Sequence, residues 1–242
     1  MSKKIMKKFH FIVQSKGGVG KSFLTYMLGV KHQENDKSLF LDVDGSTKTS
    51  VAQLGFLKTK KRVAVIDLQD YQERIARDKL FGSIEEIASF PFENYFLDFG
   101  APESEQLPAL FSRDVSQKDF KEFAEFLNSE FTFHIVIAGG TAYVACMEYL
   151  TKLYGVIGEE FKIIVWLNES MFQNYQLQID QLEATALALE IPITRFGNIG
   201  SGSVLEIAVV NNIQQGLGQE GIDKSGFLVI KQMNKLISAL TI

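Results

Sequence analysis

A glycine-rich stretch near the N-terminus has the residues of a phosphate-binding loop. The segment "SKGGVGKS" spans 15–22 and follows an apolar run at 9–14. Glycines put no Cβ in the way of inward-turned backbone N–H groups, which form an anion cradle with the positive end of a following helix. Lys21 would supply a point charge to the β- and γ-phosphates, and Ser22 a hydroxyl to Mg²⁺. The stretch therefore predicts a nucleotide phosphate site.

The loop departs from the strict pattern G-x-x-x-x-G-K-[ST]. Its first position is Ser15 instead of glycine, and a second lysine, Lys16, lies inside the loop. A chance glycine-rich turn is the alternative, but the strand-like run before it, the helical pattern after it and the lysine–serine pair favour a phosphate loop. A solvated loop lysine is the alternative interpretation of Lys16.

Carboxylates follow three of the short apolar runs. "LFLDVD" carries Asp42 and Asp44, "YFLDFG" carries Asp98, and "VAVIDLQ" carries Asp67. Because the carboxyl ends of parallel strands meet at one edge of a sheet, such side chains would lie beside the phosphate loop. Carboxylate oxygens are ligands that Mg²⁺ prefers, together with water and phosphates. We expect Asp98 to be the metal ligand, since "GAP" follows it, and Asp67 to cap a turn.

Short β-rich runs alternate with longer helical patterns along the chain. This alternation predicts an α/β fold with a mostly parallel sheet flanked by helices on both faces. The length of 242 residues suits one domain, 1–242. The predicted strands are 9–14, 38–44, 62–69, 95–100, 133–140, 161–168 and 191–197. The predicted helices are 21–35, 71–89, 116–129, 141–154, 170–190, 204–215 and 225–240.

Composition excludes several classes of protein. The net charge of −4 argues against a protein whose whole surface binds nucleic acid, although it does not exclude a local basic patch. Cys146 is the one cysteine, so the chain has no intramolecular disulfide and no metal site built from its own cysteines. The apolar run at 9–13 is too short for an export segment, and no stretch approaches the ~20 apolar residues of a spanning helix. We therefore expect a cytoplasmic protein.

The loop "KGGVGKS" resembles the deviant Walker A motif of the ParA/MinD group of P-loop ATPases. The resemblance implies the P-loop NTPase fold, ATP and Mg²⁺ as cofactors, and slow ATP hydrolysis. In that group the early lysine, here Lys16, reaches the phosphates bound by the other subunit of a nucleotide-sandwich dimer. The resemblance therefore implies an ATP-dependent homodimer, and it gives the second lysine a role.

The same resemblance assigns the remaining site residues. Asp98 becomes the Walker B aspartate, and Asp44 becomes the residue that orients the attacking water, while Asp42 supports the strand end or caps a helix. The family often has proline and an amide residue after this motif, whereas this chain has "GST". Catalytic roles fall on Lys16, Lys21 and Asp44, and metal binding on Ser22 and Asp98. Nucleotide binding falls on Gly17, Gly18, Val19, Gly20, Lys21, Ser22, Phe23 and Asn168.

Asn168 closes the strand "IIVWLN". In related ATPases an asparagine near this point reads the adenine ring, and an amide suits that task because it donates and accepts at once. A strand-end turn former is the alternative.

Further segments are similar to the TraL-type nucleotide-binding proteins of conjugative plasmids. "FLDFGAPE", "HIVIAGGTA" and "IIVWLNES" occur in that order and spacing, and the similarity spans residues 9 to about 170. It implies a role in conjugal transfer, with a protein partner in the DNA-transfer or partition apparatus.

Three alternatives stay open beside conjugal transfer. A partition ATPase would need a basic surface for DNA, and "KTKKR" at 58–62 is a candidate part of one. A membrane-cycling ATPase would use the apolar face of 224–240, although such a segment is more often a packed final helix. A metabolic synthetase would need a substrate pocket, for which "IAGGTAY" is the unexplained strand end. An iron–sulfur ATPase is excluded, because one thiolate per subunit cannot supply four ligands in a dimer.

Overall fold

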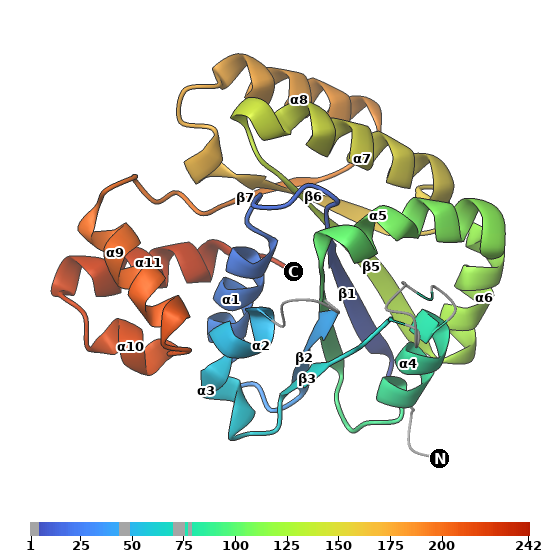
Figure 1. Cartoon of the computed structure of the whole chain (residues 1–242), viewed down its shortest axis with the longest axis horizontal. Coiled ribbons are helices and arrows are strands. Elements are labelled where there is room, and N and C mark those ends of the chain that lie inside the picture. The colour runs from blue at the N-terminus through green and yellow to red at the C-terminus, as the bar shows by residue number, and fades with distance from the viewer. Residues whose placement is uncertain (1–4, 44–48, 70–75, 77–78) are drawn as a thin grey trace.

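The computed structural model describes residues 5–43, 49–69, 76 and 79–242. In this part of the chain, seven parallel strands form one sheet in the order β3-β2-β4-β1-β5-β6-β7 (Figure 1). The strands are β1 (Lys7–Val13), β2 (Ser38–Val43), β3 (Val63–Val65), β4 (Asn94–Phe99), β5 (Ser129–Ile137), β6 (Lys162–Asn168) and β7 (Ile193–Phe196). The predicted parallel α/β fold is confirmed.

Helices cover both faces of the sheet. The face that carries α1 also carries the C-terminal helices, which pack on α1 and α2 (Figure 1). This side has α1 (Lys21–Lys31), α2 (Thr49–Gln53), α3 (Gly55–Lys58), α9 (Val204–Gln214), α10 (Gln219–Asp223) and α11 (Phe227–Ala239). The other side has α4 (Lys79–Ala88), α5 (Ala101–Ala109), α6 (Gln117–Phe126), α7 (Tyr143–Ile157) and α8 (Gln176–Ala188). Three single turns complete the set: η1 (Leu110–Asp114), η2 (Gly140–Ala142) and η3 (Glu169–Met171).

The structure corrects several predicted boundaries. The strand predicted at 62–69 is only the three-residue β3, and β5 begins four residues before its predicted start at 133. Part of the helix predicted at 71–89 lies outside the described residues, and the remainder is α4. Helix α5 was not predicted, because "APESEQLPA" has two prolines and little apolar periodicity. Pro102 is tolerated in the first turn of that helix, where its missing N–H costs no hydrogen bond.

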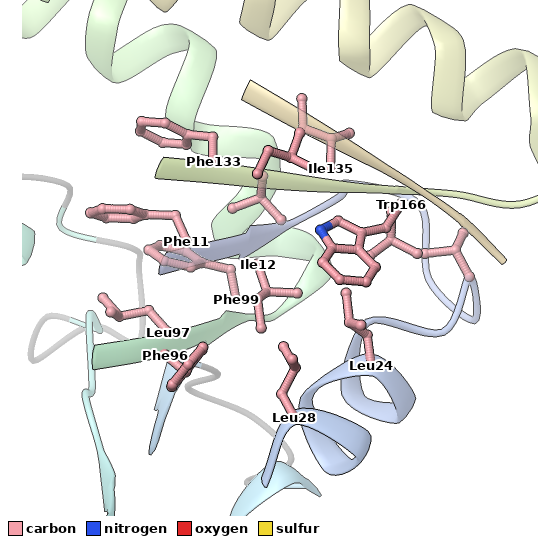
Figure 2. Close-up of a cluster of buried hydrophobic side chains, with 14 of the residues drawn as sticks. Phe11, Ile12, Leu24, Leu28, Phe96, Leu97, Phe99, Phe133, Ile135 and Trp166 are labelled. Atoms are coloured by element: carbon pink, nitrogen blue, oxygen red, sulfur yellow. The ribbon is translucent and has the colours of Figure 1, made fainter. Parts of the chain in front are cut away.

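The core consists of two apolar layers, one on each face of the sheet. Alternate residues of β1 point to opposite sides, as the period of a strand requires. Figure 2 shows Phe11 and Phe133 on one side of the strands and Leu24 of α1 beneath Trp166 on the other. Aromatic rings dominate the layer away from α1, where ring contacts join Phe9, Phe11, Phe120, Phe131, Phe133 and Phe161.

A chain of hydrogen-bonded rings crosses the layer beneath α1. The indole Nε1 of Trp166 donates to His134 Nδ1 at 2.8 Å. His134 Nε2 lies 3.0 Å from His10 Nδ1, and the ring of His10 stacks on Phe96 with centroids 4.7 Å apart. Because an indole N–H can only donate, His134 Nδ1 must accept, and the proton of His134 is on Nε2. The chain therefore requires that both imidazoles are neutral.

Candidate nucleotide-binding site

The phosphate loop connects β1 to α1 at the carboxyl edge of the sheet. Gly18 and Gly20 have φ values of 76° and 103°, a region that side chains with a Cβ disfavour. Gly17 and Gly18 are exposed, and a Cβ on either would meet no described atom within 4 Å, so this part of the loop is not covered by other described residues. At Gly20, the N-cap of α1, no side chain caps the helix. The loop and the first turn of α1 therefore present backbone N–H groups to an anion.

The two lysines of the loop occupy different environments. The side chain of Lys21 is 8% exposed, and its Nζ donates to the carbonyl of Gln14 at 2.8 Å. Lys16 is exposed, and its backbone N–H donates to Gln14 Oε1 at 3.3 Å. The cation of Lys21 therefore lies within the loop, whereas that of Lys16 faces outward and is accessible to another molecule.

Asp98 is a buried carboxylate at the end of β4. It is 2% exposed, and Asp42 on the neighbouring strand β2 is its register partner. The hydroxyl of Ser50 donates to Asp98 Oδ2. Burial raises the pKa of Asp98, while the Ser50 hydroxyl and the charge of Lys21 oppose the rise. The carboxylate is thus costly to keep ionised until a cation joins it.

The side chains at Asp98 fit a magnesium ion that is also held by phosphates. Asp98 Oδ1 is buried and has no hydrogen-bond partner among the described residues. The hydroxyls of Ser22 and Thr25 are close enough to lower the pKa of Asp98. No group of three His, Cys, Asp or Glu side chains able to hold a metal occurs in the described part of the chain. The protein would therefore supply a carboxylate and a hydroxyl, which is how Mg²⁺ is usually bound beside a nucleotide.

Asn168 lies against the outside of the phosphate loop. Its Nδ2 donates to the carbonyl of Val19 at 2.9 Å, and its Oδ1 accepts from the hydroxyl of Ser170 at 2.8 Å. A Cβ on Gly20 would lie 2.4 Å from Asn168 Nδ2, so this glycine also permits the close approach. The side chain thus braces the loop from the end of β6.

The other candidate residues differ in where the structure places them. Val19 is buried and Phe23 is half-buried, with its ring 6.0 Å from that of Phe196. Asp42 Oδ2 accepts from the backbone N–H of Val51 at 3.1 Å, so it caps the start of α2. Asp44 lies outside the described residues. Asp67 accepts from the N–H of Gln69 at 2.8 Å, and its predicted turn role is confirmed.

The structure adds site residues that the sequence analysis missed. Gln14 is fully buried, and its amide donates to the carbonyl of Val136 on β5 at 3.0 Å. Its backbone N–H donates to Ser104 Oγ at 3.2 Å, which ties the loop to α5. An amide residue at the end of an apolar run, three residues before the first glycine, was a usable signal for Gln14. Ser50 gave none, because its partner Asp98 is 48 residues away.

Two of the alternative functional segments have structural roles. Arg62, the last residue of "KTKKR", is 2% exposed, and its guanidinium donates to the carbonyls of His32, Gln33 and Ser38. Arg62 is therefore not available to a basic surface for DNA. Helix α11 buries Val229, Met233 and Ile237 against the rest of the protein, as a packed final helix does. Among the described residues, no helix is both long and apolar enough to cross a membrane.

Comparisons with known proteins agree with this architecture. MinD cell division protein of Aquifex aeolicus superposes over 98% of this chain and 98% of its own, with a TM-score of 0.50 and 15% identity. A ParA family ATPase from Chlorobium tepidum covers 96% of each chain, with a TM-score of 0.51 and 16% identity. The fold is that of ParA and MinD.

Sequence comparison gives a more specific relationship than the fold does. Protein TraL of Escherichia coli is 26% identical over 164 residues, which is 67% of this chain and 64% of the length of TraL. No protein-family model matches the chain. The chain is therefore ParA/MinD-like and related to TraL.

Proposed function

We propose that the protein is a Mg²⁺·ATP-dependent ATPase switch. The observation that carries the proposal is the convergence, at one edge of the sheet, of an exposed glycine-rich loop, the buried Lys21 and the buried carboxylate of Asp98. Residues 17–23 would hold the phosphates, Ser22 and Asp98 would hold the magnesium ion, and Asn168 would contact the adenine ring. The bound metal would neutralise phosphate charge.

Hydrolysis would follow the pattern that the resemblance implies. Asp44 would orient the attacking water, and Lys21 would stabilise the charge that develops on the transferred phosphate. ParA family proteins carry the name ATPase, which supports this reading. We expect a slow reaction in the absence of a partner.

Dimerisation would be coupled to ATP through Lys16. Its side chain is exposed, in the same loop as the buried Lys21, which supports a contact with a nucleotide bound by a second copy of the chain. A cation supplied in trans would also stabilise transition-state charge, as an arginine finger does. MinD of Aquifex aeolicus is known in complex with MinC, which supports a protein partner for the ATP-bound state here.

Conjugal transfer is the process that we propose for this switch, with the protein acting in the cytoplasm. The sequence relationship to TraL supports it. Replacing the gene by its Lys21→Ala form should lower the frequency of plasmid transfer in a mating assay and leave plasmid retention unchanged. The opposite pattern would favour partition.

Nucleotide binding is the first test. Calorimetry with ATP and Mg²⁺ should give a clear affinity for the wild type and at least about a tenfold loss for Lys21→Ala, since the lysine would contact the β- and γ-phosphates. Lys118→Ala, at an exposed position of α6, is the matched control and should bind as the wild type does. Intact binding by Lys21→Ala would refute the site.

Solution mass tests the trans lysine. A non-hydrolysable ATP analogue should produce a dimer where ADP does not, and Lys16→Ala should remove the dimer or its hydrolysis while each monomer still binds nucleotide. A monomer in every state, or a dimer in every state, would mean that Lys16 does not couple ATP to assembly.

A further inference from the structure

The first turn of α2 lies directly over two strand-end carboxylates. The Ser50 hydroxyl donates to Asp98 Oδ2, and the next residue, Val51, donates its N–H to Asp42 Oδ2 at 3.1 Å. Ser50 is 3% exposed, so water does not replace its hydroxyl at the carboxylate. Since Asp42 and Asp98 are register partners on β2 and β4, one short segment contacts both acids.

The hydrogen bond from Ser50 engages only one of the two carboxylate oxygens of Asp98. Oδ2 accepts from Ser50, whereas Oδ1 is buried without a hydrogen-bond partner among the described residues. A hydroxyl that fixes one oxygen prevents rotation of the carboxylate and holds the second oxygen ready for a cation.

The far end of the same segment packs on the C-terminal helices. A Cβ on Gly216, in the turn after α9, would lie 2.7 Å from the carbonyl oxygen of Ala52. A Cβ on Gly55 would lie 3.0 Å from the carbonyl oxygen of Gly216. The backbone at Ala52 and Gly55 is therefore in direct contact with the backbone at Gly216. A small displacement of α2 must also displace the turn after α9.

We propose that Ser50 is a positioning residue for Asp98, and that α2 mechanically links the magnesium site to the C-terminal helices α9–α11. The inference rests on the proposed Mg²⁺·ATP site. It gives a role to the region after β7, in which the sequence offers no motif.

The test of Ser50 separates magnesium affinity from nucleotide affinity. Binding of a fluorescent ATP analogue is measured in EDTA and then along a Mg²⁺ titration. Ser50→Ala should weaken the apparent Mg²⁺ affinity by about 10- to 100-fold, the usual effect of losing a residue that orients a metal ligand. Its nucleotide affinity in EDTA should match that of the wild type, and Ser50→Thr, which keeps the hydroxyl, should recover most of the Mg²⁺ affinity.

Ser38→Ala is the matched control for a lost buried hydroxyl. Ser38 is also fully buried, at the opposite end of β2 from Asp42, and its hydroxyl lies 3.2 Å from His32 Nδ1. This variant should leave the Mg²⁺ titration unchanged. An equal loss of affinity in EDTA and in Mg²⁺ for Ser50→Ala, or no loss in either, would overturn the positioning role. A wild-type protein that binds no Mg²⁺·ATP would instead refute the proposed function itself.

The link to the C-terminal helices has its own pair of variants. Gly216 and Gly202 have similar φ values of 63° and 71°, but a Cβ on Gly202 would meet no described atom within 4 Å. Gly202→Ala therefore reproduces the backbone strain without the contact. Gly216→Ala should weaken Mg²⁺ affinity at least threefold more than Gly202→Ala does, and its effect should be non-additive with Ser50→Ala. Equal titrations for the two glycine variants, both confirmed as folded by circular dichroism, would overturn the link.

Discussion

Acidification should destabilise this protein well above the pH at which most carboxylates titrate, because its histidines are held neutral. Burial, followed by the charge of His32, lowers the pKa of His10 from 6.5 to about 3. Burial also lowers the pKa of His32 to about 4 and that of His134 well below 6.5. A group whose pKa is lower in the folded protein contributes stability above its unfolded pKa and loses it as the pH falls. The loss should therefore begin near pH 6.5.

The magnitude follows from the pKa of His10. At pH 5.0 the unfolded chain has bound a proton at this residue and the folded protein has not, over 1.5 pH units below 6.5. At 1.36 kcal/mol per unit, the free energy of unfolding falls by about 2 kcal/mol from His10 alone. His134 contributes in the same direction. Half-buried His32 contributes less than its pKa suggests, because solvent screens it.

Urea unfolding at pH 7.5 and pH 5.0 measures this loss. Far-UV circular dichroism and the fluorescence of Trp166, the one tryptophan, give two independent signals. In His10→Asn, the amide oxygen can still accept from His134, but position 10 no longer titrates. The variant should be less stable at pH 7.5, having lost its stacking on Phe96, and should lose about 2 kcal/mol less than the wild type on acidification. Equal losses in the two proteins would refute the reasoning.

Three further predictions concern the site and its supports. Asp98→Asn should stabilise the nucleotide-free protein at pH 7.5 in thermal melts, because burial raises the pKa of Asp98. The variant should gain no stability from Mg²⁺·ATP. If Mg²⁺·ATP stabilises the variant as much as it stabilises the wild type, Asp98 is not the metal ligand. Gly20→Ala should lose nucleotide binding in calorimetry and about 1–2 kcal/mol of stability, since its φ is 103° and its Cβ would meet Asn168 at 2.4 Å; normal binding would contradict the loop geometry. Arg62→Met should cost about 3 kcal/mol in urea unfolding, because three backbone carbonyls lose their donor; a loss below about 1 kcal/mol would show that water replaces it.

Local chemistry in the sequence was enough to predict the fold and the centre of the candidate site. The alternation of strand and helix patterns predicts the parallel sheet, and the glycines before Lys21 predict a loop between a strand and a helix. These signals are reliable because each depends on neighbours within a few residues. Helix α5 escaped prediction because tertiary contacts, such as the bond from Gln14 to Ser104, stabilise a stretch with weak helical periodicity.

What the sequence by itself determined is which chemical groups are available: a phosphate loop, two loop lysines and carboxylates at strand ends. Tertiary structure decided how these groups are oriented. It turned Lys21 inward and Lys16 outward, paired Asp42 with Asp98 across two strands, and brought Ser50 onto Asp98. The physical reason is that side-chain type is a local property, whereas burial, register and hydrogen-bond partners arise only when distant segments pack together.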